Sequence, residues 1–415
     1  MWFYLKLAWR NLFRNKRRSF LAGTAIGTGL AALIFVDALI IGMERNMIKS
    51  ATASFLGEGQ IHRQGFRETQ DVALTIRRFA EVMASLQNDA AVANAAPRVI
   101  AIGMITSPAN VSAVSVVGID PAVEQYLSQM DDVMIAGDYF GDGSEREIVI
   151  GSKLAELLEV GLGDRVVVTA AQVADSANDG QGGDLAQEMF RISGIYHFNV
   201  RELDASMAFI RLSKAQQMLG LNGAVHEIAI KFHDPELGRD ETNPFWNKYS
   251  QFDNVAVGWT RLLPQLKATF DLAGFSILIT AVILFGVVAL GIVNTLFMSL
   301  HERMFEFGVM RAVGTRPFRM ATLILWEAGA LAILSIGIGI LISVIVTAIV
   351  ARVGIDFTGV EYSGATFREL LYPVMTFEQY LFYPFWVFVF TIFVGIYPAV
   401  HAARMSPAEA MRKSL

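Results

Sequence analysis

The sequence has no cysteine among its 415 residues. Disulfides, thiolate zinc sites, iron–sulfur clusters and cysteine nucleophiles are therefore excluded, although this absence does not identify a redox compartment. Charge is also scarce, because only 18% of the residues are Asp, Glu, Lys or Arg. The 34 basic residues face 39 acidic ones, and the resulting net charge of −5 argues against a generally basic nucleic-acid binder. We expect no nucleic-acid partner.

Motifs for nucleotide, metal or hydrolytic chemistry are missing as well. No Gly-x-x-x-x-Gly-Lys-Ser/Thr loop occurs, so the chain has no recognisable means of cradling nucleotide phosphates. His301-Glu302 begins like a zinc-protease helix, but Phe305 stands where the second histidine belongs. The polar segment 175–184 has Ala177 where a calcium loop needs an oxygen ligand, and it is interpreted as a mobile loop. We expect no enzymatic activity, metal or cofactor on this chain, so any energy source must be a partner.

Hydrophobic residues make up 53% of the chain, more than in an ordinary soluble protein. They concentrate in four stretches, each reaching the about 20 residues of helix that cross a bilayer. The long polar segment 44–271 separates the first stretch from the other three and has room for folded domains. The pattern predicts an α-helical membrane protein with four transmembrane helices, one plus three, and a large mixed α/β domain between the first and second spans. The stretches are 20–43, 272–300, 320–351 and 381–400.

The loop charges predict the orientation. Residues 1–19 carry six basic and no acidic groups, residues 301–319 carry four and two, and residues 401–415 carry three and one, a net of +10. Residues 44–270 and 351–380 together carry a net of −12. Because Lys and Arg near span ends are retained in the cytoplasm, we predict that the termini and the middle loop are cytoplasmic. The domain 44–271 and the short loop 352–380 then lie on the outer side of the membrane.

The basic first segment could be mistaken for part of a signal peptide. The stretch that follows is longer than a signal sequence core, and residues 42–46 after it show no small-residue cleavage site. Residues 1–19 mix aromatic, apolar and basic side chains. They are predicted to form an amphipathic helix at the membrane surface.

The polar segment reads as alternating strands and helices. Strand-forming β-branched runs are bounded by turns, and Ser152 is a suitable N-cap for the helix 153–158. Helices are also predicted over 77–87 and 213–219 from their apolar spacing. The predicted strands cover 98–105, 111–118, 147–150, 165–169, 189–197, 207–212 and 227–232.

The loop 301–319 contains a short helical pattern. Phe305, Val309 and Val313 recur at helical spacing, with acidic and basic residues between them. A solvated loop would explain such a pattern, but the missing nucleotide site favours a contact for an ATPase partner. At this point the sequence resembles a known family, the FtsX-like or MacB-type permeases of ABC transporters (type VII). The resemblance rests on residues 8–18 (AWRNLFRNKRR), 303–314 (RMFEFGVMRAVG), 398–412 (PAVHAARMSPAEAMR) and 148–155 (IVIGSKLA) followed by Gly163-Asp164.

The resemblance implies a half-transporter that pairs with a second permease, a copy of itself or a homologue, and binds two copies of a cytoplasmic ABC ATPase. It implies that ATP-driven movement passes through a stalk, residues 44–54 and 262–271, to the periplasmic domain. Substrate would not cross the membrane centre. The matching motif implies ATPase coupling by Glu302, Arg303, Glu306, Phe307, Gly308, Arg311 and Gly314.

Residues 57–66 (GEGQIHRQGF) narrow the resemblance to the LolC/LolE-type permeases of lipoprotein-release systems. The best interpretation is therefore extraction of a lipidated or amphiphilic substrate at the periplasmic face, with membrane lipids and a periplasmic carrier or substrate protein as partners. Two alternatives stay open. One is efflux of peptides, macrolides or other amphiphiles, and the other is a regulatory complex that activates an envelope hydrolase.

Four residues inside the spans are unusual. Gly23 and Gly27 give the first span a smooth face, for packing within the chain or against a second copy. Asp37 and Glu327 are ionisable groups at membrane depth, which favours function, but hydration, snorkelling or local pairing would also explain them. The aromatic run 380–386 is most simply an interfacial belt, with gripping of lipid chains as the sharper alternative.

Overall fold

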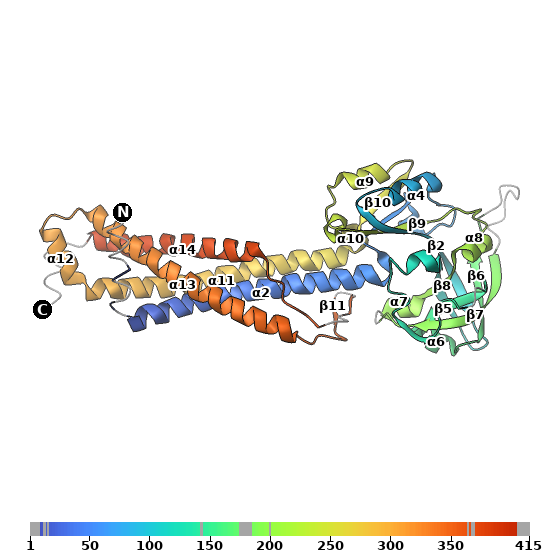
Figure 1. The fold of residues 1–415 in the computed structure, drawn as a ribbon, viewed down its shortest axis with the longest axis horizontal. Helices are drawn as coiled ribbons and strands as arrows, with labels where there is room; N and C mark the ends of the chain where they lie inside the picture. Colours follow the sequence, from blue (N-terminus) through green and yellow to red (C-terminus); the bar gives the residue numbers. More distant parts are fainter. Residues whose placement is uncertain are drawn as a thin grey trace. The chain divides into compact units, whose positions relative to one another are not determined.

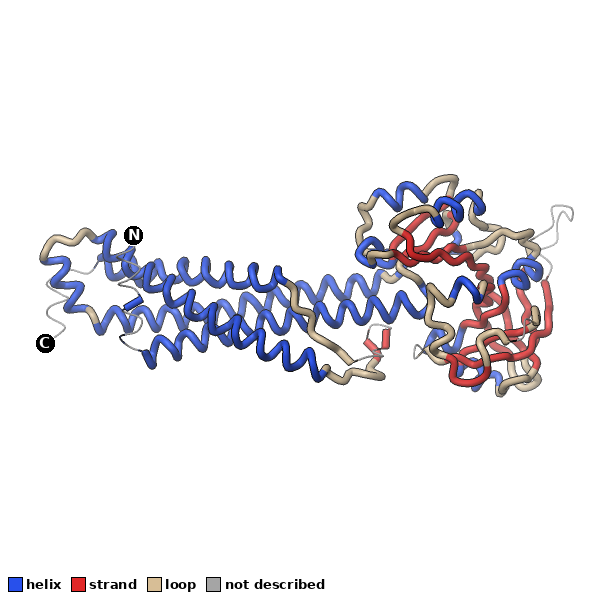
Figure 2. The backbone as a smooth tube through the Cα atoms, in the orientation of Figure 1, coloured by secondary structure: helices blue, strands red, loops and turns tan. Residues whose placement is uncertain are grey.

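A computed structural model describes residues 9–10, 14, 16–141, 144–173, 185–198, 201–362, 365–366 and 370–404. The polar loop 175–184, most of the predicted first helix and the last part of the tail, 405–415, lie outside the described residues. The chain divides into two compact units. The helical unit comprises Met1–Arg45, Phe270–Phe357 and Glu369–Leu415, and the α/β unit comprises Asn46–Thr269 and Thr358–Arg368. Strands concentrate in the α/β unit (Figure 2).

Among the described residues, four helices are long and apolar enough to cross a membrane (Figure 1). They are α2 (Lys16–Ala51), α11 (Pro264–Glu302), α13 (Pro317–Val353) and α14 (Phe377–Arg404), and they contain the four apolar stretches. Helices of 36 and 39 residues, α2 and α11, are about 54 and 58 Å long at 1.5 Å per residue. Both exceed the about 30 Å of a bilayer core.

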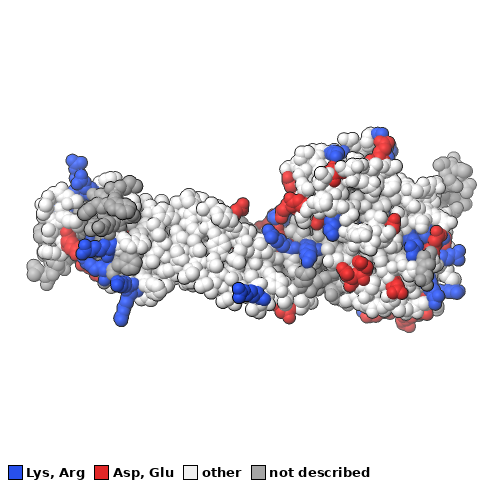
Figure 3. Space-filling view, in the orientation of Figure 1, with Lys and Arg blue, Asp and Glu red and all other residues white. Residues whose placement is uncertain are grey.

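The surface of the helical unit matches a membrane environment. Figure 3 shows its flank almost free of charged side chains, with Lys and Arg gathered at the end that carries the short helix α12 (Met304–Ala312). Leu290 and Val282 of α11 are 73% and 64% exposed. Apolar side chains left uncovered on this scale are stable only in an apolar solvent or against another apolar surface.

Ten strands form one mixed sheet in the α/β unit. Their order is β10-β1-β9-β2-β3-β8-β5-β7-β4, and β6 pairs with both β2 and β7. The long β2 pairs with β9 through its first half and with β3 and β6 through its second, so it runs through both halves of the sheet. The strands are β1 (Gly59–Arg63), β2 (Val92–Thr106), β3 (Val111–Ile119), β4 (Met134–Gly137), β5 (Glu147–Gly151), β6 (Arg165–Ala171), β7 (Leu185–Tyr196), β8 (Met207–Arg211), β9 (Glu227–Phe232) and β10 (Asn254–Gly258).

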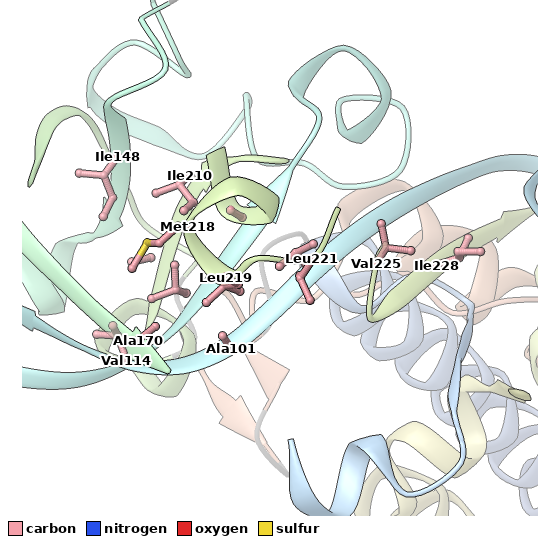
Figure 4. Close-up of a cluster of buried hydrophobic side chains, with 14 of the residues drawn as sticks. Ala101, Val114, Ile148, Ala170, Ile210, Met218, Leu219, Leu221, Val225 and Ile228 are labelled. Carbon is pink, nitrogen blue, oxygen red and sulfur yellow. The ribbon is translucent and has the colours of Figure 1, made fainter. Parts of the chain in front are cut away.

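Short helices cover the sheet and close the core. Met218 and Leu219 of α8 lie among Ile148, Ile210 and Ala101 from the strands (Figure 4). Burial of such side chains supplies the main driving force for this unit. The helices are the π-helix η1 (Thr52–Leu56), α3 (Phe66–Thr69), α4 (Phe79–Gln87), α5 (Pro121–Glu124), α6 (Ser152–Leu158), α7 (Arg201–Ser206), α8 (Leu212–Leu219), the 3-10 helix η2 (Pro235–Gly238), α9 (Pro244–Tyr249) and α10 (Trp259–Leu262); β11 (Glu361–Tyr362) and β12 (Ala365–Thr366) form a hairpin.

The seven predicted strands are confirmed as β2, β3 and β5–β9, and the three predicted helices as α4, α6 and α8. The N-cap at Ser152 is wrong. Gly151 occupies the N-cap of α6, and Ser152 is the first helical residue. The helix begins directly after Gly151, the last residue of β5, so it starts one residue earlier than the N-cap preference of serine suggests.

Candidate functional site

The loop between the second and third long helices folds into the short helix α12. Arg303 has non-helical backbone angles and separates α11 from α12, so the chain turns there. After α12, Gly314 adopts φ +98°, a conformation that glycine accepts without strain. The amide of Thr315 then donates to Met310 O at 2.9 Å, which satisfies a carbonyl at the helix end. The turn at Gly314 therefore sets where α12 stops.

A buried ionic network fixes α12 to the helices beside it. Arg303 Nη1 donates to Glu327 Oε1 of α13 at 2.5 Å, and Arg303 Nε donates to Glu306 Oε2 at 2.9 Å. Arg14 Nη1 donates to the other oxygen of Glu306 at 3.0 Å. The side chains of Arg303 and Glu327 are 9% and 8% exposed, whereas that of Glu306 is 45% exposed. Glu327, predicted as an ionisable residue of uncertain role, is thus paired.

The charges in this network support one another. Burial alone would lower the pKa of Arg303, but the Glu327 and Glu306 carboxylates outweigh it and hold that pKa above its ordinary value. The hydrogen bond from Arg303 lowers the pKa of Glu306, and the bond from Arg14 adds to this. Arg303 and Glu306 therefore stay charged at neutral pH.

The two faces of α12 differ in exposure. Phe307 is 2% exposed and packs with Leu300, Met320 and Ala399, which come from the ends of α11, α13 and α14. On the outer side Phe305, Val309 and Val313 are 53%, 40% and 83% exposed. A short helix anchored by one buried aromatic ring and presenting an apolar outer face is suited to docking a partner.

The seven residues predicted for coupling fall into two groups. Arg303, Phe307 and Gly308 are buried, so they hold α12 in place. Glu302, Glu306 and Gly314 are exposed and Arg311 is half-buried. The structure adds Arg14, which the matched motif did not include. A signal was present, because residues 1–19 hold six basic groups and no acid to pair with them.

The predicted glycines of the first span lie against α13. A Cβ at Gly23 would meet Leu334 and Ile338 at 3.4 Å, and one at Gly27 would lie 2.8 Å from Ser335 O. A Cβ at Gly339 would in turn lie 2.8 Å from Gly27 O, so the two backbones approach closely. Both glycines thus contact a helix of the same chain.

Asp37 lies where α2 meets the start of α14. Its carboxylate accepts a hydrogen bond from Gln379 Nε2 at 2.8 Å. Asp37 is half-buried and lines an open groove with a volume of about 620 Å³. It therefore belongs to a different part of the helical unit from α12.

A Ser–His–Asp group in the α/β unit does not form a catalytic relay. Ser152 Oγ and Asp204 Oδ2 both lie 2.9 Å from the same ring atom, His197 Nδ1. A relay needs the hydroxyl and the carboxylate on opposite ring nitrogens. Among the described residues, no group of three or more His, Asp or Glu is placed to hold a metal ion.

These features define a class of protein. The chain has four helices suited to a membrane and a large α/β unit, its sequence lacks a nucleotide-binding loop, and α12 presents an apolar face. Permease subunits of ATP-driven transporters combine these properties. The chain matches the MacB-like periplasmic core domain over residues 19–238 and the FtsX-like permease C-terminal domain over residues 278–407. It belongs to the FtsX-like, MacB-type family of ABC transporter permeases, in which ATP hydrolysis resides on a separate subunit.

Curated relatives extend over most of the chain. The lipoprotein-releasing system transmembrane protein LolC of Xylella fastidiosa is 23% identical over 93% of this chain and 92% of its own. LolE of Haemophilus influenzae, from the same kind of system, is 21% identical with the same coverage. The periplasmic region of MacB from Actinobacillus actinomycetemcomitans is similar in structure, with a TM-score of 0.34 and 11% identity, over 50% of this chain and 92% of that one.

Proposed function

We propose that this permease releases lipidated proteins from the outer leaflet of a bacterial inner membrane, driven by a cytoplasmic ATPase. The support is the sequence similarity to two lipoprotein-releasing permeases, each matched over 92% of its length. The +10 and −12 charge balance of the two sets of loops supports cytoplasmic termini and a periplasmic α/β unit. Two ATPase copies and a second permease complete the assembly.

The arrangement of α12 is the observation that carries the mechanism. Its outer residues Phe305, Val309 and Val313 insert into the ATPase, while Glu302, Glu306 and Arg311 supply polar contacts at the rim. Phe307 and the Arg303–Glu327 ion pair transmit the movement, because they join α12 to α13 through buried contacts. ATP and Mg²⁺ are bound by the partner, and this chain converts their turnover into displacement of its helices.

Charge reversal tests the role of α12. Glu306→Lys and Arg311→Glu should each lower ATPase stimulation and recovery of the complex, and leave membrane insertion intact. Val313→Asp should do the same, because it places a charge in the proposed apolar contact at a site that is 83% exposed. The control is Leu157→Asp on α6, also an exposed apolar position, at 48%. Stimulation and recovery that match the wild-type values in all three α12 variants would contradict the assignment.

The substrate needs a separate test. Photocrosslinkers in the periplasmic halves of α2 and α11, at the exposed positions Val36 and Leu278, should trap acyl chains of lipoproteins when the complex is isolated from cells. Efflux would instead trap peptides or macrolides, and a regulatory complex would trap a soluble hydrolase through the α/β unit. Mass spectrometry of the trapped molecules separates the three functions. The proposed contact between α12 and the ATPase is the same in all three.

A further inference from the structure

The groove beside Asp37 is built from two elements of the helical unit. One wall is the part of α2 that carries Asp37 and Ile41, and the other is the first turns of α14. The chain just before α14 is fastened to α2, because the amide of Val374 donates to Ala38 O at 2.9 Å. Gly42 permits this approach, since a Cβ there would overlap Tyr372 O. The groove is therefore held open by backbone contacts and exists without a ligand.

Hydrogen bonds also fix the polar residues of the groove. Gln379 Oε1 accepts from the amide of Thr376 at 3.0 Å, so its Nε2 is aimed at Asp37. Tyr383 lines the same groove. A carboxylate with one donor still has lone pairs to offer. The side chain is thus positioned to accept a further hydrogen bond from a ligand.

The lining of the groove has one sign of charge. Asp37 and Glu378 both line it, and none of its nine described lining residues is Lys or Arg. Phe382, Tyr383 and Phe385 provide aromatic rings, and the lining is mostly apolar. Carboxylates beside aromatic faces attract an ammonium group, and apolar walls accept hydrocarbon.

The groove opens on the side of the helices that has no protein cover. Leu381, Phe382 and Phe385 are 64%, 58% and 57% exposed and belong to a membrane-spanning helix. The surrounding lipid therefore reaches the groove directly. We propose that this groove binds one phospholipid with a primary ammonium headgroup, with the headgroup at Asp37 and an acyl chain along the aromatic wall. The inference needs the helices to span a bilayer, but it does not depend on the nature of the transported cargo.

Native mass spectrometry of the full chain tests the site. The protein is placed in nanodiscs of equal parts phosphatidylethanolamine and phosphatidylglycerol, and the lipids retained after mild detergent release are counted. Wild-type protein should retain phosphatidylethanolamine in excess. Asp37→Asn should reduce the ratio of the two retained lipids by about tenfold, the loss of one charge-assisted contact. Asp271→Asn, an exposed carboxylate outside the groove, should leave the ratio unchanged.

A second variant guards against misfolding of the first. Leu381→Trp fills the groove at an exposed position and keeps Asp37, and it should also lower retention of phosphatidylethanolamine. Equal lipid ratios in wild type, Asp37→Asn and Leu381→Trp would overturn the proposal. Displacement of the retained phospholipid from wild-type protein by a synthetic acylated peptide would also overturn it, since the groove would then be a cargo site. If this chain failed to bind an ATPase, the proposed function would be contradicted and the lipid site would not be affected.

Discussion

Two arginines, one in each unit, have nearly the same surroundings. Arg98 of β2 contacts Glu124 at 2.6 Å and Glu227 at 3.1 Å, with its guanidinium 3.8 Å from the ring centroid of Phe55. Arg303 contacts Glu306 and Glu327 and lies 5.1 Å from the ring of Phe307. Each is therefore an arginine between two glutamates, above a phenylalanine.

Exposure separates the two clusters. The side chains of Arg98 and Glu124 are 0% exposed and that of Glu227 is 7% exposed, so this cluster is closed. In the Arg303 cluster Glu306 is 45% exposed and also binds Arg14, so one of its partners can be exchanged. A closed ion cluster fixes a fold, whereas one with an exposed member can respond to a binding partner.

Phe55 connects the Arg98 cluster to the segment that directly follows α2. It lies in the π-helix η1, directly after the long helix α2 ends at Ala51. Such π-helical turns are rare and often occur at functional positions. Arg98 thus ties the end of α2 to β2 and, through Glu227, to β9.

The largest expected effect comes from Arg98→Met. Two buried carboxylates would lose their partner, and the free energy of unfolding of the α/β unit should fall by about 3–5 kcal/mol. Hydrogen–deuterium exchange of β2 and β9 in the full chain measures this. The matched control is Arg63→Met, which breaks the partly exposed pair with Asp253 and should cost below about 1 kcal/mol. Equal losses of unfolding free energy in Arg98→Met and Arg63→Met would show that the Arg98 cluster is not closed.

Arg303→Met should have a smaller and more local effect. Loss of its charged hydrogen bonds should destabilise the docking of α12 by about 2–3 kcal/mol and leave the exchange of β2 unchanged. Amide exchange in residues 304–312 reports the local change. ATPase stimulation should fall in parallel, because α12 no longer moves with α13. Stimulation at the wild-type level, with α12 loosened, would separate the ion pair from coupling.

The stability of the α/β unit should depend on pH through a buried histidine. His226 is buried, with Nδ1 accepting from the amide of Ile100 and Nε2 bonded to Val72 O, and burial lowers its pKa. The unfolded chain binds a proton near pH 6.5 that the fold resists, so stability should be constant above pH 6.5 and decline below it. The slope should approach about 1.4 kcal/mol per pH unit for this histidine.

Denaturant titrations between pH 5 and 7 measure this slope. His226→Gln should reduce it. His62, whose pKa burial also lowers, should supply the remainder. A slope that is identical in wild type and His226→Gln would contradict the assignment of a neutral, buried imidazole.

Glu306→Gln should change stability least. Its carboxylate is half exposed, so its ion pairs with Arg303 and Arg14 contribute below about 1 kcal/mol to folding. The variant therefore tests whether the exposed carboxylate of the Arg303 cluster acts in coupling and not in folding. ATPase stimulation should fall while the thermal midpoint stays within about 2 °C of wild type. A larger drop in the midpoint would make Glu306 a structural residue like Glu124.

Much of the fold could be predicted from the sequence, because long apolar runs and β-branched strands have strong local patterns. The strand β1 was missed, since Gln60 and His62 are polar and yet buried between β9 and β10. The network at α12 was only partly predicted. Phe305 and Phe307 have the same chemistry, and tertiary packing alone decides which is buried. Arg303 and Glu327 pair across 24 positions, a distance that no local pattern reports.

The central claim is that the outer face of α12 contacts a separate ATPase. The chain has no cysteine, so Val313→Cys introduces a single reactive thiol at an 83% exposed position. Its alkylation rate is measured in the full permease with and without the purified ATPase, beside Leu157→Cys as a control. The account predicts that the ATPase slows alkylation of Val313→Cys at least tenfold and does not affect Leu157→Cys. An unchanged rate for Val313→Cys in an assembled complex would contradict it.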